Sequence, residues 1–265
     1  TSSVTGVDSY VVANKKKNTG KKKKRKEKNK KDSDVETVVP ALTSEEQRRY
    51  DYFFLEAVRL KLQRKYDAAF EVLQHCLAIN PEAASAQYEL AQYYMFLKQI
   101  PKGQQALEKA VKNEPDNFWY AQGLANLYLQ QNEQDKALDL LENMATRFTD
   151  KLDPLYNLMD LYNRREAYDQ VIDVLNRLEE RTGKNEQISM EKFRIYLQKK
   201  DTKNAFSEIE SLVAEYPMDT RYQVILGDVY MQNGKQEEAY NIYRKVLSEE
   251  PDNAMAMYSF ASCID

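Results

Sequence analysis

The chain has 265 residues and a formal net charge of −3, which hides two opposed parts: residues 1–31 carry twelve basic and two acidic groups, whereas residues 32–265 carry twenty-seven basic and forty acidic groups. Because an acidic body repels phosphates, nucleic acid is disfavoured as a partner. Gly and Pro are scarce, at seven each, which favours an all-α chain, and no run approaches the roughly 18 apolar residues of a membrane-spanning helix.

The first segment, residues 1–42, lacks hydrophobic periodicity and is almost continuously positive from Lys15 to Lys31. Such a block buries too little apolar area to offset chain entropy, so we expect a disordered, lysine-rich basic tail. A solvated leash is the simplest interpretation. Contact with an anionic membrane or another polyanion, and a role in nuclear import or nucleic-acid binding, are alternatives that the charge pattern leaves open.

Order is predicted to begin at residue 43. Thr43 and Glu46 have the spacing of a capping box, in which each side chain accepts a backbone hydrogen bond at a helix start. An apolar helical run follows directly, so a helix is expected to begin near Ser44. Residues 43–265 are therefore predicted to form the folded domain.

The decisive signal further along the chain is a period of 34 residues. Pro81 and Pro115 are 34 residues apart, as are Pro217 and Pro251, and three such steps separate Pro115 from Pro217. The tetrapeptide Glu-Pro-Asp-Asn at 114–117 recurs at 250–253, four periods later. A fixed period of this length indicates a stack of similar supersecondary units.

The same positions of each unit carry the same kinds of residue. A Leu followed by a small residue and then by Tyr recurs as Leu90-Ala91...Tyr94, Leu124-Ala125...Tyr128 and Leu226-Gly227...Tyr230. This pattern resembles the tetratricopeptide-repeat (TPR) family, whose unit is a pair of antiparallel helices. The resemblance implies an all-α, right-handed α-α superhelix of six repeats and a truncated seventh, with starts near residues 50, 84, 118, 152, 186, 220 and 254.

The fifth repeat departs from this pattern. Lys192 and Phe193 stand where Leu and a small residue are expected, as in Leu90-Ala91 and Leu226-Gly227. We therefore expect this helix pair to be splayed or locally repacked.

The residues offer little for catalysis. His75 is the only histidine, and Cys76 beside it lies about 100° away around a helix, so Ser-His-Asp and Cys-His arrangements are excluded unless His75 itself serves. His75 is expected on the outer side of its helix and Cys76 in the core. Clustered zinc ligands and a Gly-x-Gly phosphate loop are both missing from the sequence. We therefore predict that the protein is not an enzyme and holds no metal and no cofactor.

If the units stack as the resemblance implies, the second, fifth, sixth, ninth and twelfth positions of each first helix line a concave groove. Aromatic side chains there can cover the apolar groups of an extended peptide, and amides can pair with its backbone. The alternative is that the aromatics pack between repeats or against another copy of the chain. The predicted peptide-groove residues are Tyr88, Gln92, Trp119, Gln122, Asn126, Tyr156, Asn157, Arg194 and Arg221.

Residues 254–265 read as another first helix whose partner is missing. Met257, Phe260, Ala261 and Ile264 would leave an apolar stripe uncovered, whereas repeat arrays usually end on a polar cap. We therefore expect a truncated chain, with a homodimer through this helix as an option.

Together these features predict a non-catalytic protein–protein interaction scaffold that binds a peptide or protein in its concave groove. The Ser/Thr-rich start without Met, followed by a charged leash, resembles a mature bacterial lipoprotein. This favours the bacterial envelope, periplasm-facing and lipid-anchored, over the cytoplasm, with a role in envelope assembly or export. Two other roles stay open: a structural arm of a homo-oligomer, and a recruiting segment of a longer enzyme.

Overall fold

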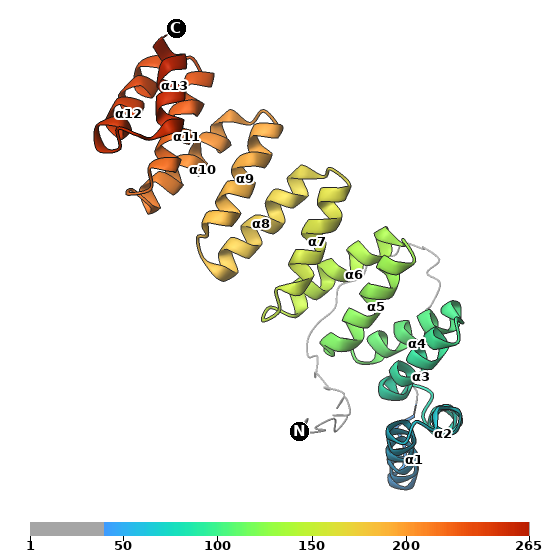
Figure 1. Cartoon of the computed structure of the whole chain (residues 1–265). Helices are drawn as coiled ribbons and strands as arrows, with labels where there is room; N and C mark the ends of the chain where they lie inside the picture. Colours follow the sequence, from blue (N-terminus) through green and yellow to red (C-terminus); the bar gives the residue numbers. More distant parts are fainter. Residues whose placement is uncertain (1–39, 265) are drawn as a thin grey trace, which may run out of the picture. The chain divides into compact units, whose positions relative to one another are not determined.

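The computed structural model describes residues 40–264, and this range contains thirteen α-helices and no β-strand (Figure 1). All thirteen belong to the compact unit Leu42–Asp265. The predicted disordered tail, residues 1–42, lies outside the described residues except for its last three. The helices are α1 (Ser44–Leu62), α2 (Tyr66–Ile79), α3 (Ala84–Phe96), α4 (Ile100–Asn113), α5 (Phe118–Gln130), α6 (Gln134–Arg147), α7 (Asp153–Arg164), α8 (Tyr168–Thr182), α9 (Glu186–Gln198), α10 (Thr202–Glu215), α11 (Thr220–Gln232), α12 (Gln236–Glu249) and α13 (Ala254–Ile264).

The predicted start of the first helix is confirmed. Helix α1 begins at Ser44, and Thr43 is its N-cap. The Glu46 backbone N–H donates to the Thr43 hydroxyl at 3.1 Å, and the Thr43 N–H donates to the Glu46 carboxylate at 3.3 Å. Two backbone donors that the first turn leaves without helical partners are therefore satisfied by side chains.

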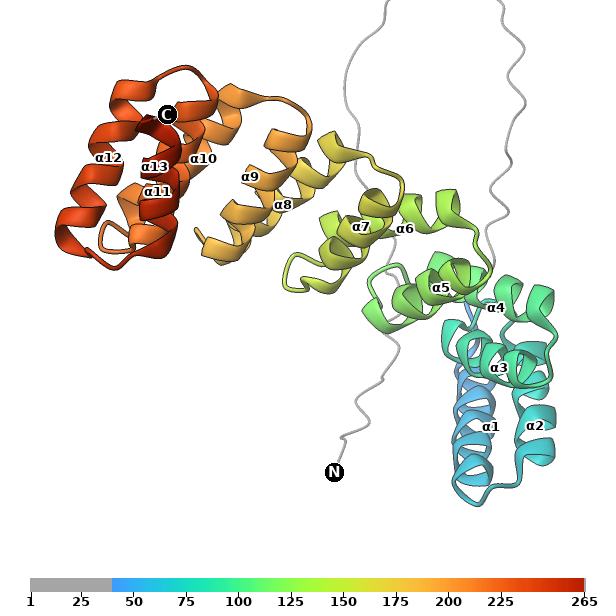
Figure 2. The ribbon, with the colours of Figure 1, turned by 45° about the horizontal axis from the view of Figure 1, so that its top comes forward.

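The fold is an all-α solenoid of helical hairpins. Each helix packs on the helix before it and the helix after it, so that α1 pairs with α2, α3 with α4, and so on to α11 with α12 (Figures 1 and 2). The two helices of a hairpin approach closely because the second one carries a small buried residue at the crossing. Gly103 shows how tight this is, since a methyl group added there would lie 2.8 Å from the Met95 sulfur. The small residues at this position are Ala69, Gly103, Ala137, Ala205 and Ala239.

The turn inside each hairpin repeats one backbone conformation. A residue with positive φ occurs at the same place in all six hairpins, and the backbone N–H of the following residue donates to a carbonyl five residues earlier. Only the last of the six is a glycine, although a left-handed conformation favours glycine. The six residues are Arg64, Lys98, Asn132, Glu166, Lys200 and Gly234, with φ between 54° and 74°.

Neighbouring hairpins are joined by a repeated hydrogen bond. The Tyr128 hydroxyl donates to Glu108 at 2.8 Å, and the Tyr162 hydroxyl donates to Glu142 at 2.7 Å, one period later. In both cases the tyrosine lies on an odd-numbered helix and the glutamate on the preceding even-numbered helix. This contact gives a physical reason for the recurrent Tyr of the repeat.

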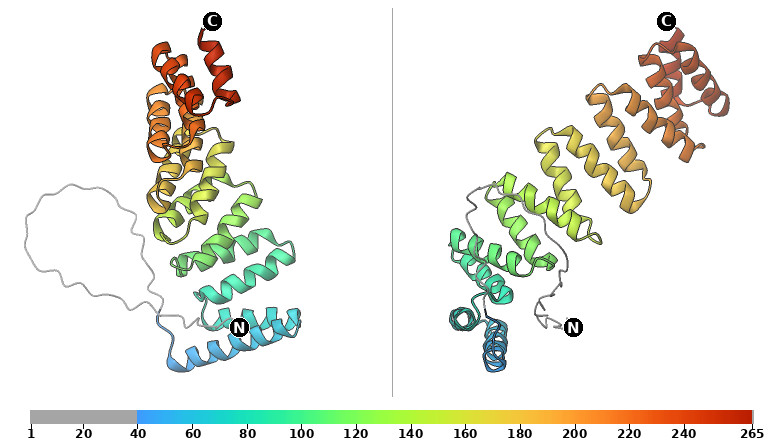
Figure 3. Two further views of the ribbon diagram at one scale, coloured as in Figure 1. Left: turned by 60° about the vertical axis from the view of Figure 1, so that its left-hand side comes forward. Right: turned by 180° about the vertical axis from the view of Figure 1, so that it is seen from behind.

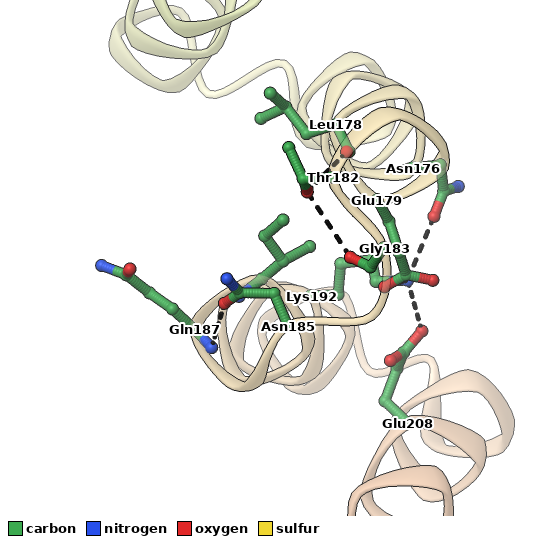
Figure 4. Close-up of polar contacts among 10 residues, drawn as sticks. Asn176, Leu178, Glu179, Thr182, Gly183, Asn185, Gln187, Lys192 and Glu208 are labelled. Atoms are coloured by element: carbon green, nitrogen blue, oxygen red, sulfur yellow. Dashed lines mark hydrogen bonds and ion pairs between the residues drawn. The ribbon is translucent and has the colours of Figure 1, made fainter. Parts of the chain in front are cut away.

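The fifth repeat is locally repacked around Lys192, which is only 3% exposed (Figure 4). Its ammonium lies 2.8 Å from Glu208 on α10 and 3.1 Å from Glu179 on α8, and it donates to Asn176 at 3.2 Å. Burial disfavours the charged ammonium, but the hydrogen bonds to Glu208 and Glu179 outweigh that effect and raise the pKa of Lys192. An ion-pair network thus fills the place where other repeats pack a leucine.

Candidate functional site

The candidate site is the surface formed by the second, fifth, sixth, ninth and twelfth positions of the first helices, which we call the odd-helix face. All nine predicted groove residues lie on α3, α5, α7, α9 or α11. Six of them are exposed and three are half-buried. The exposed ones are Gln92, Trp119, Asn126, Tyr156, Arg194 and Arg221, and the half-buried ones are Tyr88, Gln122 and Asn157.

Two large aromatic side chains stand open on this face. Trp119 is 67% exposed and Tyr156 is 49% exposed. The start of α5 is fixed by Asn117, whose side chain accepts from the Trp119 and Tyr120 backbone N–H groups at 3.1 and 3.3 Å. Trp119 therefore sits on a capped, rigid first turn, with the Lys151 ammonium 5.9 Å from its ring.

Side-chain amides lie next to the aromatics. The Gln122 amide donates to the Asn126 oxygen at 2.9 Å along one turn of α5. The side-chain oxygen of Gln122, Oε1, is buried and has no hydrogen-bond partner among the described residues. This pair orients amide groups toward a face on which a peptide backbone can find both donors and acceptors.

Tyr88 differs from the other predicted aromatics. Its ring stacks on Tyr120 of the next repeat with centroids 4.7 Å apart, and burial raises the pKa of Tyr88. For Tyr88 the structure therefore matches the alternative interpretation, in which an aromatic packs between repeats. Tyr88 therefore contributes to packing between α3 and α5 more than to a free contact surface.

The two arginines are already paired with carboxylates. Arg194 forms an ion pair with Glu191 on the same helix, and Arg221 pairs with Asp219 at 2.7 Å and with Glu186 at 3.4 Å. The hydrogen bond from Arg221 holds the pKa of Asp219 below its usual value. These guanidinium groups therefore offer little uncompensated positive charge to a ligand.

Cys76 and His75, the two side chains considered for catalysis, lie in different environments. Cys76 is fully buried, and burial raises the pKa of its thiol to about 11, so a reactive thiolate is not formed near neutral pH. His75 lies on the exposed side of α2, and its ring packs on Phe53.

No three His, Cys, Asp or Glu side chains are grouped to hold a metal ion within residues 40–264. No helix in that range has the length and apolarity to cross a membrane.

Sequence reasoning missed one group of exposed side chains at the hairpin turns. Leu62 and Phe96 are 80% and 86% exposed, and Leu97 is 53% exposed. A comparison of the thirteenth and fourteenth positions across the six repeats would have found them, because the other four repeats carry polar residues there.

Stacked hairpins in a 34-residue register, with a small residue at the crossing in five of the six hairpins, define the class of α-helical repeat scaffolds. Models of the tetratricopeptide repeat match residues 60–127 and residues 220–253. The chain therefore contains tetratricopeptide repeats, and its all-α superhelical repeat fold is that of a protein–protein interaction scaffold.

Two curated relatives can be aligned with most of this chain. Cellulose synthase operon protein C of Escherichia coli K12 is 28% identical over 219 residues, and the putative cellulose synthase operon protein C of Escherichia coli O157:H7 is 26% identical over 215 residues. Each match covers 80% of this chain and 16% of the relative, so the chain spans about a sixth of their length. Among solved structures, that of Naa15/Naa10 bound to HypK-THB is similar in fold, with a TM-score of 0.53 and 17% identity over 83% of this chain and 35% of that one.

Proposed function

We propose that this chain is a non-catalytic scaffold that binds an extended segment of a partner protein along the odd-helix face. The observation that carries the proposal is the exposure of Trp119 and Tyr156 on neighbouring first helices. Large aromatics that contribute little to the core are costly to leave in water and are enriched at the centres of protein interfaces.

The contacts around them suit an extended chain. Trp119 and Tyr156 can cover two apolar side chains of the ligand, and Asn126 and Asn157 can pair with its backbone groups. Because Asn117 caps the start of α5 and the helix pairs are tightly crossed, Trp119 and Asn126 are held by a rigid element. Little conformational entropy is then lost on binding.

We further propose that this binding serves assembly or export in the bacterial envelope. The support is the similarity to cellulose synthase operon protein C of Escherichia coli, which extends over 80% of the chain. A lipid-anchored, periplasm-facing position is part of the same proposal. A scaffold of this kind would hold a partner segment near the export machinery without performing chemistry itself.

The test uses a photoreactive amino acid in the full chain. Placed at Tyr156, it should crosslink to one defined segment of a partner in extracts of the native host, whereas placement at Lys109, exposed on α4, should not. Replacing Trp119 by Ala should reduce the Tyr156 crosslink by about thirtyfold while leaving helicity unchanged. Equal crosslinking from Lys109 and Tyr156, or an undiminished crosslink in the Trp119 variant, would place the binding surface elsewhere.

A second role, as a structural arm of a homo-oligomer, is favoured by one observation on α13. Met257, Tyr258 and Ile264 are 52%, 78% and 63% exposed on this helix. Met257 and Ile264 belong to the predicted uncovered stripe, whereas Phe260, also predicted there, packs on Tyr240. Self-association through α13 would bury these side chains. Light scattering over a concentration series should then show a dimer that Tyr258→Ser and Ile264→Ser together abolish, and a monomer at every concentration would exclude this role.

A further inference from the structure

The turns of the first two hairpins form an exposed apolar edge. We call it the apolar turn edge and define it as Leu62, Tyr66, Phe96 and Leu97. These side chains are 80%, 51%, 86% and 53% exposed, although three of them are among the most hydrophobic residue types. Leu62 ends α1 and Phe96 ends α3, so both lie at the turns of their hairpins. Figure 3 shows these first two hairpins as neighbours.

The fold itself does not require apolar residues at these positions. Leu62 and Phe96 both occupy the thirteenth position of their repeats, and Leu97 occupies the fourteenth. The other four repeats build the same turn, with the same backbone conformation, from polar residues. Their thirteenth and fourteenth residues are Gln130 and Gln131, Arg164 and Arg165, Gln198 and Lys199, and Gln232 and Asn233. The apolar turn edge is therefore a property of this part of the surface, and not of hairpin stacking.

Positive charge predominates around the apolar turn edge, since residues 62–67 and 96–101 hold three basic residues and one acidic residue, Asp67. Arg64, Lys65 and Lys98 lie in the same two turns, are exposed, and form no ion pair within residues 40–264. The nearest paired lysine, Lys61, is held by Glu89 at 3.1 Å. This concentration of positive charge contrasts with residues 32–265 as a whole, in which acidic groups outnumber basic groups by forty to twenty-seven.

From this juxtaposition we propose that the apolar turn edge docks onto the surface of an anionic lipid bilayer. Leucine and phenylalanine at protruding turns can enter the boundary between headgroups and acyl chains, while flanking lysine and arginine side chains contact the anionic headgroups. Tyr66, whose ring packs near Tyr93, keeps its hydroxyl at the level of the headgroups. Leu62 and Tyr66 also line a hollow beside α1, but Phe96 and Leu97 lie outside its lining, so the edge as a whole suits a broad surface better than a peptide.

The first experiment locates the contact with a fluorescent label in the full chain. The native cysteines, Cys76 and Cys263, are both buried, so a polarity-sensitive label attaches selectively to a new cysteine. Leu97→Cys places the label on the apolar turn edge, and Met218→Cys places it at a residue that is 90% exposed in a distant turn. Vesicles of phosphatidylcholine and phosphatidylglycerol in equal parts should shift the emission at residue 97 to the blue and leave residue 218 unchanged.

The second experiment measures how much the edge contributes. An edge variant, Leu62→Ser with Phe96→Ser, is compared with a control variant, Tyr52→Ser with Met218→Ser, whose residues are also exposed but lie outside the apolar turn edge. All variants keep residues 1–31 unchanged, so the twelve basic groups there contribute equally to each. The edge variant should lose at least about tenfold in vesicle affinity relative to the control, and replacing Arg64 by Gln should cost about another fivefold.

Three outcomes would overturn the proposal. One is an edge variant that binds vesicles as tightly as the control variant. Another is a label at residue 97 that reports no change with anionic vesicles. The third is a blue shift at residue 97 with an acidic, apolar peptide but not with vesicles, which would make the apolar turn edge a protein-binding site.

Discussion

The Tyr162 hydroxyl donates a 2.7 Å hydrogen bond to Glu142 across the boundary between two repeats. Glu142 also pairs with Arg177 at 2.9 Å, so one carboxylate ties α7 and α8 to the preceding hairpin. The equivalent bond between Tyr128 and Glu108 shows that this is a repeated joint. Interactions of this kind hold the odd-numbered helices in a fixed register, which is what positions the odd-helix face.

Removing the Tyr162 hydroxyl should weaken this joint. Tyr162→Phe deletes one hydrogen bond to a charged acceptor without changing the ring, so the free energy of unfolding should fall by about 1–2 kcal/mol. Tyr156→Phe is the matched control, because Tyr156 is exposed and its hydroxyl makes no described hydrogen bond. Urea unfolding followed by circular dichroism measures both, and equal midpoints for the two variants would contradict the joint.

The raised pKa of Tyr162 predicts that the protein loses stability at alkaline pH. Burial and the hydrogen bond to Glu142 raise the pKa of Tyr162 from 10.0 to about 12. Since the unfolded chain ionises first, the stability that depends on neutral Tyr162 is intact below about pH 10 and is lost as pH rises toward 12. Unfolding midpoints between these pH values should therefore fall, and less steeply for Tyr162→Phe. A parallel decline in both proteins would assign the loss to other groups, such as Tyr222.

The buried network around Lys192 should be strongly coupled. Glu208→Gln removes one charge partner from an ammonium that is nearly inaccessible to water, and the free energy of unfolding should fall by about 2 kcal/mol. Lys192→Leu restores the residue of neighbouring repeats but strands two carboxylates, so it should also destabilise. Combining the two changes should cost clearly less than their sum, whereas simple additivity in a double-mutant cycle would show that Lys192 and Glu208 do not interact.

Two glycines should respond in opposite directions to alanine. Gly234 has φ of 74°, so Gly234→Ala should lower the free energy of unfolding by about 1 kcal/mol. Gly123 lies inside α5, where an added methyl would lie 3.4 Å from Tyr88. Gly123→Ala should therefore raise the free energy of unfolding by about 0.5–1 kcal/mol through helix propensity. Thermal unfolding of the two variants checks the sign directly, and a stabilising Gly234→Ala would mean that this turn is not left-handed in solution.

Much of the fold could be predicted because it depends on local pattern. The 34-residue spacing predicted helical hairpins, and the Thr43 and Glu46 capping box predicted the start of α1. Cys76 and His75 also fall on the buried and exposed sides of α2 as predicted. Such features follow from helix periodicity and from end signals within a few residues of each other.

The parts that could not be predicted depend on contacts between elements. Repacking at Lys192 was expected, but its partners Glu179 and Glu208 lie on two other helices and carry no mark in the sequence. The stacking of Tyr88 on Tyr120 depends on the rotation between repeats, which a period alone does not define. The left-handed turn residues were missed because arginine, lysine and glutamate do not signal positive φ. That a partner segment binds to the odd-helix face stays a prediction.

Trp119 provides the most direct test of that face, because it is the only tryptophan in the chain and is 67% exposed. Its fluorescence can be followed while the crosslinked partner segment, made as a tryptophan-free peptide, is titrated into the full chain. Binding along the odd-helix face should shift Trp119 emission to the blue and protect it from acrylamide quenching, with the same midpoint as peptide binding measured by calorimetry. Saturable binding by calorimetry with unchanged Trp119 emission and quenching would contradict the account.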